Sequence, residues 1–357
     1  MLNIFKRRGP PPPPDHVPDA ALPVVWLLGK TGAGKSSLVR VLTDQTDVEI
    51  GDGFRACTPR SQSYDFPPDQ PLVRFLDTRG LGEVGYDPTA DIAECRGRSH
   101  VVLVVCRLDD PVQGAVADAL HEVMRQDRKA PAILVLTGTD LIADPQALGR
   151  AQASIKAAID RAAGRDLPVA ALSLAPETGP DAEDLDRLRA LLLDALPAAG
   201  LLLAHDSAAT AEEAAFLKVR RRVLFYSGVA GSSDVAPLIG AVSVPATQLA
   251  MLRELGQHYG VAWDRKTAAA FLAALGLGAG ARFTLSYGVR QLTKLIPVVG
   301  QTVGAAAAGS ISFAATYALG RAAAYFLHGA AAGSPPDEAA LRKIYANAFK
   351  RSSHDTD

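Results

Sequence analysis

The stretch of eight residues from position 29 to position 36 decides the fold of the first half of this chain. It reads Gly29-Lys30-Thr31-Gly32-Ala33-Gly34-Lys35-Ser36 and fits the pattern G-x-x-x-x-G-K-[S/T] at every position. The apolar run before it, residues 23–28 (PVVWLL), predicts a buried parallel strand. Residues 37–42 after it (SLVRVL) have helical spacing. A strand therefore leads into a glycine-rich loop that opens a helix.

This local arrangement predicts a phosphate-binding loop. Backbone N–H groups of the loop and of the helix N-terminus can surround a phosphate group. We expect all eight residues of the motif and the following Ser37 to contact the ligand. Lys35 is expected to reach the β- and γ-phosphates, and Ser36 is expected to hold Mg²⁺.

A second apolar run, residues 72–76, ends in Asp77-Thr78-Arg79-Gly80. An aspartate at a strand tip after a phosphate loop is placed to hold Mg²⁺ through water. The N–H group of Gly80 is placed to meet a γ-phosphate. This segment predicts the metal side of a nucleotide site.

Two later strand-like runs end in residues suited to a purine base. Residues 132–136 lead into Thr137-Gly138-Thr139-Asp140, after another apolar run at 100–106. The Asp140 carboxylate can accept two hydrogen bonds from the N1 and N2 edge of guanine, which adenine cannot donate. Residues 168–172 lead into Ser173, Leu174 and Ala175, whose backbone is placed to meet the guanine O6. The pattern favours guanine over adenine.

The order and spacing of these motifs resemble the small GTPase-like G domains of the Era and septin-like branches, over about residues 23–198. The resemblance implies GTP or GDP with Mg²⁺ as ligands, GTP hydrolysis, and a doubly wound, mostly parallel α/β sheet. It also implies that Thr58, in Ala56-Cys57-Thr58-Pro59, is the switch-one threonine that completes the Mg²⁺ shell. The implied metal ligands are Ser36, Thr58 and Asp77. The implied catalytic residues are Lys35, Thr58 and Gly80.

Three positions depart from this family. Gly138 stands where the guanine motif has a lysine whose stem lies over the base. Leu81 stands where many GTPases carry a water-orienting glutamine, and Gly32 stands where potassium-activated relatives have an asparagine. We therefore expect slow hydrolysis unless an activator protein, a homodimer or an arginine of the switches assists. The arginines concerned are Arg55, Arg60 and Arg79.

Composition bounds the class of protein. The chain has 357 residues, which suggests at least two domains, and a formal net charge of −1, which gives no electrostatic footprint for nucleic acid. Cys57, Cys95 and Cys106 show neither metal spacing nor a disulfide framework, so we expect reduced thiols in the cytoplasm. Residues 1–22 contain no signal-peptide core and carry a proline run at 10–14, so we expect a disordered tail. A membrane-surface contact through Ile4 and Phe5 is the alternative.

The second half of the chain has a different character. After a helix at 181–196, we expect a linker helix at 199–225, an all-α domain rich in Ala and Gly at 226–330, and a short final helix and tail at 331–357. Charged residues are absent from three segments of the second half, at 235–252, 267–281 and 295–320. Gly, Ala, Ser and Thr recur in them, which predicts helices packed through small residues.

This half resembles the bacterial "domain of unknown function 697" of YcjF-like proteins, over about residues 225–330. The resemblance rests on residues 236–242 (APLIGAV), 296–303 (IPVVGQTV) and 257–261 (QHYGV), and it brings no known catalytic residue. Two interpretations stay open: a soluble or peripheral helical bundle, or helices embedded in the membrane. The cations at 220–222 and at 290 and 294 would favour the inner face of the cytoplasmic membrane.

The sequence therefore predicts a GTP-binding switch protein with slow hydrolysis and a helical module for membrane or partner association. One alternative is an RNA-modification or ribosome-assembly GTPase, against which the near-zero net charge argues. Another is a scaffold that binds nucleotide without cycling.

Overall fold

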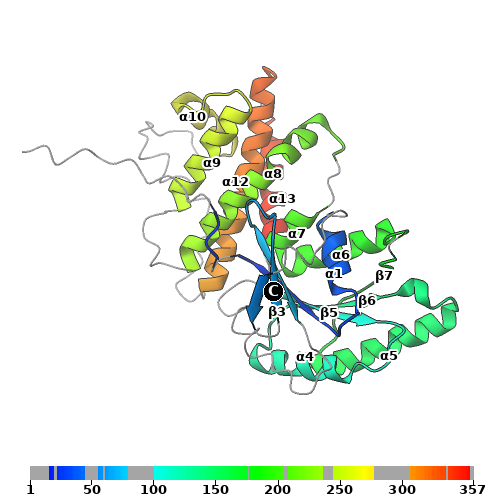
Figure 1. The fold of residues 1–357 in the computed structure, drawn as a ribbon. Coiled ribbons are helices and arrows are strands. Elements are labelled where there is room, and N and C mark those ends of the chain that lie inside the picture. Colours follow the sequence, from blue (N-terminus) through cyan, green and yellow to red (C-terminus); the bar gives the residue numbers. More distant parts are fainter. Residues whose placement is uncertain are drawn as a thin grey trace, which may run out of the picture. The chain divides into compact units, whose positions relative to one another are not determined.

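The computed structural model describes residues 16–19, 22–44, 55–58, 61–78, 100–175, 177–204, 208–235, 244–276, 305–334 and 337–353. The chain forms two compact units (Figure 1). One comprises residues 22–205, and the other comprises residues 1–21 together with 206–357.

In the part of the chain that the structure describes, the first unit is built on a mixed sheet of seven strands in the order β2-β3-β4-β1-β5-β6-β7. The strands are β1 (Val24–Leu28), β2 (Arg55–Thr58), β3 (Ser61–Phe66), β4 (Val73–Thr78), β5 (His100–Arg107), β6 (Ala132–Thr137) and β7 (Val169–Leu172). All neighbours from β4 to β7 are parallel, and β2 and β3 add an antiparallel edge. This is the doubly wound, mostly parallel sheet that the sequence predicts.

Helices cover both faces of the sheet. On one face, α4 (Gly114–Gln126) and α5 (Pro145–Ala163) lie side by side, and Leu120 and Ile159 join a core with Trp26, Val104 and Leu134 of the strands. Figure 1 shows α1 (Lys35–Leu42) and α6 (Ala182–Ala195) on the other face. The short α7 (Pro197–Leu203) packs against α6. The central strands β1 and β6 are buried along their whole length, which is why they read as continuous apolar runs.

Strands β2 and β3 are additional to those that the apolar runs of the sequence predict. A strand that pairs antiparallel can keep polar side chains on one face, so its sequence need not be a continuous apolar run. In β3 and β4, for example, Asp65 and Arg74 are cross-strand neighbours joined by two hydrogen bonds of 2.7 and 2.9 Å.

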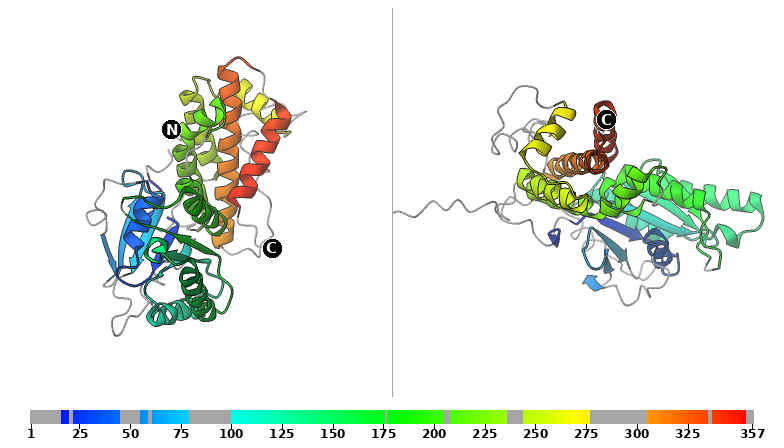
Figure 2. Two further views of the ribbon diagram at one scale, coloured as in Figure 1. Left: turned by 90° about the vertical axis from the view of Figure 1, so that its right-hand side faces the viewer. Right: turned by 90° about the horizontal axis from the view of Figure 1, so that it is seen from above.

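The second unit is helical. Its helices are α8 (Ala211–Val235), α9 (Val244–His258), α10 (Arg265–Ala274), α12 (Ala305–Ala331) and α13 (Glu338–Ser352). The two long helices α8 and α12 pack together, and α9 and α13 pack against α12 (Figure 2). A Cβ atom at Gly231 would lie 2.9 Å from the carbonyl oxygen of Gly309, and one at Gly320 would lie 2.5 Å from Cγ1 of Val223. Small residues thus permit the close approach of these helices.

Two boundaries differ from the predicted ones. Where we expected one linker helix at 199–225, the structure has the separate helices α7 and α8. Helix α8 continues to Val235 because apolar residues beyond position 225, such as Val229 and Ala230, are buried in the helical unit. The predicted tail at 1–22 contains the buried Val17, which lies beside Gly228 of α8.

The sequence segments behind the second resemblance lie mostly outside the described residues. These include 236–242 and 296–303. Among the helices that the structure describes, none is both long enough and apolar enough to cross a membrane.

Candidate functional site

The phosphate loop connects the end of β1 to the start of α1. Gly32 and Gly34 adopt φ angles of 79° and 93°, a left-handed conformation that favours glycine. A Cβ atom at Gly29 would lie 2.4 Å from the carbonyl oxygen of Val105, so this position excludes any larger residue. The backbone itself therefore explains the three glycines of the motif.

Lys35 folds back over this loop. The residue is only 7% exposed, and its Nζ atom donates hydrogen bonds to the carbonyl oxygens of Gly29 at 2.8 Å and Lys30 at 3.0 Å. The same atom lies 3.5 Å from Oδ1 of Asp77 in β4. A fixed positive charge thus lies at the loop that is expected to receive phosphate.

The residues expected to hold Mg²⁺ come together as far as the structure describes them. The Ser36 hydroxyl donates a hydrogen bond of 3.4 Å to Oδ2 of Asp77. A hydroxyl and a carboxylate at one point form the oxygen-rich donor set that Mg²⁺ prefers, so these two residues fit the ion. Thr58 ends β2, but nothing is described of its side chain, and Gly80 and Leu81 lie outside the described residues.

The predicted base-binding residues lie at the same edge of the sheet. The Thr137 hydroxyl, at the end of β6, donates a 2.7 Å hydrogen bond to the carbonyl of Ala33 in the phosphate loop. Asp140 follows in the short 3₁₀ helix η2 (Thr139–Leu141), and its side chain is exposed. A Cβ atom at Gly34 would lie 3.0 Å from Cδ1 of Leu174, so the segment 173–175 also borders the loop.

This edge is where open α/β sheets bind ligands. In the sheet β1 lies between β4 and β5. The strands that follow β1 in the chain are added first on one side of it, up to β4, and then on the other side, from β5, so β1 stands at a topological switch point. In such folds ligands bind at the carboxyl ends of the strands beside the switch point. The phosphate loop follows β1 directly, so the predicted residues converge at the expected place.

Three residues that the sequence did not assign to the site also contact the phosphate loop: Arg107, Asp110 and Val112. Lys30 donates hydrogen bonds to Oδ2 of Asp110 at 2.8 Å and to the carbonyl of Val112. That hydrogen bond from Lys30 is the main reason why the pKa of Asp110 lies below its usual range. Arg107, at the end of β5, lies 3.4 Å from the carbonyl of Gly32 through one of its Nη atoms. Their position just after a predicted strand was the available signal.

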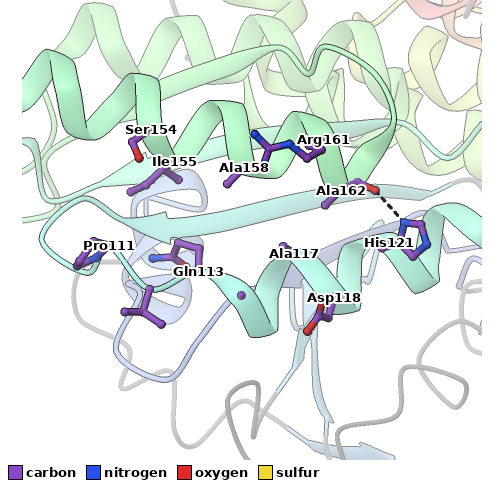
Figure 3. Close-up of a pocket in the computed structure, with 12 residues that line it drawn as sticks. Pro111, Gln113, Ala117, Asp118, His121, Ser154, Ile155, Ala158, Arg161 and Ala162 are labelled. Carbon is purple, nitrogen blue, oxygen red and sulfur yellow. Dashed lines mark hydrogen bonds between the residues drawn. The ribbon is translucent and has the colours of Figure 1, made fainter.

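A separate hollow of about 550 Å³ lies between α4 and α5, which form its two walls (Figure 3). His121 of α4 lies 3.4 Å, through Nδ1, from the carbonyl of Ala162 of α5 at this place. None of the residues expected to contact a nucleotide lines the hollow. It is therefore distinct from the site at the phosphate loop.

Comparisons with known proteins find a family model that matches part of the first unit. Residues 24–138 match the family model described as "50S ribosome-binding GTPase". The "Uncharacterized protein YkfA" of Escherichia coli (strain K12) is 27% identical over 121 residues, which cover 33% of this chain and 42% of that protein. "Magnetosome membrane protein 22" of Magnetospirillum gryphiswaldense is 35% identical over 100 residues, 27% of this chain and 49% of that protein. The chain thus spans less than half the length of either relative.

Solved structures show weaker likeness. A crystal structure of the bacterial selenocysteine-specific elongation factor EF-Sec is 21% identical, with a TM-score of 0.35, and covers 47% of this chain and 28% of that chain. An ADP-ribosylation factor-like GTP-binding protein of Encephalitozoon cuniculi, solved with GDP, is 15% identical, with a TM-score of 0.35, and covers 48% of this chain and 80% of that chain. The family match, together with the geometry of the phosphate loop, supports a P-loop GTPase domain that binds guanine nucleotide in the first unit.

Proposed function

We propose that this chain is a GTP-binding switch protein that hydrolyses GTP slowly and carries a helical unit for association with a partner or a membrane. The observation that carries the proposal is the meeting of Lys35, Ser36 and Asp77 at the phosphate loop. The Thr137–Ala33 hydrogen bond holds the predicted guanine-binding segment against the same loop.

Each residue of the proposed site has its own part in binding or hydrolysis. Backbone N–H groups of residues 29–36 surround the phosphates, and the ammonium of Lys35 offsets their negative charge. A Mg²⁺ ion held by Ser36, Asp77 and Thr58 would supply further positive charge at the β- and γ-phosphate oxygens. Water attacks the γ-phosphorus in line, GDP leaves, and Thr58 and Gly80 respond to loss of the γ-phosphate.

Asp140 would supply the choice of base. Its exposed carboxylate accepts from the N1 and N2 edge of guanine, and Ser173, Leu174 and Ala175 border the base from the next loop. We also place this G domain with the Era and septin-like branches, and the helical unit with YcjF-like proteins, on the sequence motifs alone.

The helical unit is the proposed anchor to a partner or to the inner face of the cytoplasmic membrane. Its uncharged segments and the cations that precede them support this role, and one relative is named as a membrane protein. Flotation of the full chain with anionic vesicles, with GTP or GDP present, tests it. Absence of flotation in both nucleotide states leaves partner binding as the role of this unit.

Nucleotide binding by the purified full chain tests the first part of the proposal. GTP and GDP should bind, and ATP should bind far more weakly. Lys35→Ala should abolish binding, because it removes the fixed charge at the loop, whereas the exposed Lys129→Ala should bind normally. Equal affinity for ATP and GTP would contradict the assignment of guanine.

Ribosome assembly is a second candidate function, because the matching family model is described as ribosome-binding. Co-sedimentation with large ribosomal subunits in a GTP-dependent manner would favour it. A scaffold that does not cycle is the third candidate, and single-turnover measurement of GTP hydrolysis separates it from a switch. A cycling protein would require an activator protein or a homodimer if its own turnover is slow.

A further inference from the structure

Arg107 spans the distance between the two loops that border the proposed nucleotide site. It is the last residue of β5, and its backbone pairs in register with Thr137 of β6. One guanidinium nitrogen lies 3.4 Å from the carbonyl oxygen of Gly32 in the phosphate loop. Its Cγ atom lies 3.7 Å from the place that a Cβ atom would occupy at Gly138.

Gly138 leaves room for this side chain. Its φ angle of 76° favours glycine, and a Cβ atom there would lie 2.9 Å from Cδ1 of Leu141. Position 138 therefore presents no side chain to a base bound by Asp140. The stem of Arg107, which comes from the neighbouring strand β5, lies beside position 138 instead.

The guanidinium of Arg107 is held in a defined orientation. Its Nε and one Nη atom donate hydrogen bonds to the two carboxylate oxygens of Asp109 at 2.6 and 3.0 Å. A bidentate contact of this kind fixes the plane of the group. The side chain is still 43% exposed. A planar cation that is oriented and accessible can stack on an aromatic ring.

We propose that Arg107 is a nucleotide-binding residue, which forms the surface under the guanine base and ties that surface to the phosphate loop at Gly32. The inference rests on the proposed function, since it places the base between Asp140 and the phosphate loop. The segment 137–140 (TGTD) contains no cation. The cation beside the base thus comes from β5.

The binding of GDP and of inorganic pyrophosphate distinguishes a contact with the base from a merely structural role of Arg107. If the side chain only holds the phosphate loop in shape, its loss weakens binding of GDP and of inorganic pyrophosphate alike. If it contacts the base, its loss weakens GDP and leaves pyrophosphate nearly unchanged, because pyrophosphate has no base.

Displacement of a fluorescent GDP analogue from the full chain, by GDP and by pyrophosphate, makes this distinction. Arg107→Ala should weaken GDP binding by about tenfold, which corresponds to about 1.4 kcal/mol. Arg107→Lys should recover part of that loss through the cationic stem. Pyrophosphate should compete within about twofold of the unmodified protein, because the phosphate loop keeps its contacts with Lys35 and Thr137. Arg125→Ala is the matched control, because Arg125 makes a similar bidentate contact, with Glu122, on α4.

Each other outcome overturns the inference in a recognisable way. GDP affinity of Arg107→Ala within about twofold of the unmodified protein removes Arg107 from the site but leaves the proposed function standing. Equal losses for GDP and pyrophosphate make Arg107 a support of the loop. Absence of GDP binding by the unmodified protein overturns the proposed function together with the inference. If Arg107→Ala does not fold, Arg107→Gln decides, since it keeps a donor for Gly32 but removes the cation.

Discussion

The Thr137 hydroxyl donates a 2.7 Å hydrogen bond to the carbonyl of Ala33, across 104 residues of sequence. Thr137 is 2% exposed, so this contact is shielded from water. Arg107 reaches Gly32 and Lys30 reaches Asp110 in the same region. Through the buried contact of Thr137, the end of β6 thus holds the phosphate loop in place, which lowers the cost of ordering it on binding.

Replacement of Thr137 by valine should destabilise the first unit and weaken nucleotide binding. Valine keeps the shape but removes the donor to Ala33, which should lower the free energy of unfolding by about 1–3 kcal/mol. Urea unfolding and GDP titration measure the two effects. The control is Thr247→Val in α9: Thr247 is 1% exposed, and its hydroxyl has no hydrogen-bond partner among the described residues. That change should be neutral or stabilising.

Replacement of Asp140 by asparagine should change the choice of base. The amide can no longer accept both hydrogen bonds from guanine, so discrimination in favour of GTP should fall by about 10⁴-fold, with binding of xanthine nucleotide instead. Competition between GTP and xanthosine triphosphate measures this. Asp144→Asn is the control, because Asp144 caps α5 through the N–H groups of Gln146 and Ala147 and asparagine caps equally well. Unchanged base preference in Asp140→Asn would remove Asp140 from the site.

The purified chain should hydrolyse GTP slowly, at about 10⁻⁴ to 10⁻² per second. Leu81 cannot orient water, and Gly32 cannot act as the asparagine of potassium-activated relatives. Phosphate release with excess GTP measures the rate, with Lys35→Ala as the inactive control. Turnover near one per second that survives Arg79→Ala would show that another group activates the water.

Cys106 should resist thiol reagents while the protein is folded. Burial raises the pKa of its thiol from 9.0 to about 12, so the reactive thiolate is scarce at about pH 8. Labelling of a variant in which Cys57 and Cys95 are serine should therefore require denaturant. Fast labelling without denaturant would show that β5 opens readily.

The same shift in pKa predicts how stability depends on pH. Below pH 9.0 the thiol is protonated in both states and has no effect. Between 9.0 and about 12 only the unfolded thiol loses its proton, so the free energy of unfolding falls as pH rises, by at most about 1.4 kcal/mol per pH unit. Replacement of Cys106 by alanine should remove this part of the decline.

The ion pair between Arg321 and Glu212 should matter more to the helical unit than its exposed ion pairs. The two side chains are 15% and 16% exposed and share hydrogen bonds of 2.6 and 2.8 Å, and the guanidinium lies 4.6 Å from the ring centre of Phe216. Glu212→Gln leaves the arginine charge uncompensated and should cost about 3 kcal/mol. The exposed pair of Glu338 and Arg342 is the control, and Glu338→Gln should cost about 0.5 kcal/mol or less. Urea unfolding measures both.

The strands around the site could be predicted because they are covered on both faces. Residues 24–28 and 132–137 are wholly buried, so each appears as an apolar run that a turn motif ends. The predicted helix at 181–196 was also confirmed as α6, with Asp181 as its cap. Strand β3 carries no such run, because it pairs antiparallel with β2 and β4, and an antiparallel strand can keep polar side chains on one face.

By itself, the sequence determined the phosphate loop, the order of the parallel strands along the chain and the residue types at their carboxyl ends, because these depend on local backbone conformation and on burial. Only the tertiary structure decided that α8 continues to Val235, that Val17 is buried, and that Thr137, Arg107 and Asp110 contact the phosphate loop. The physical reason is that these contacts join residues far apart in the chain, and their geometry exists only after the strands have taken their places in the sheet and the helices have packed.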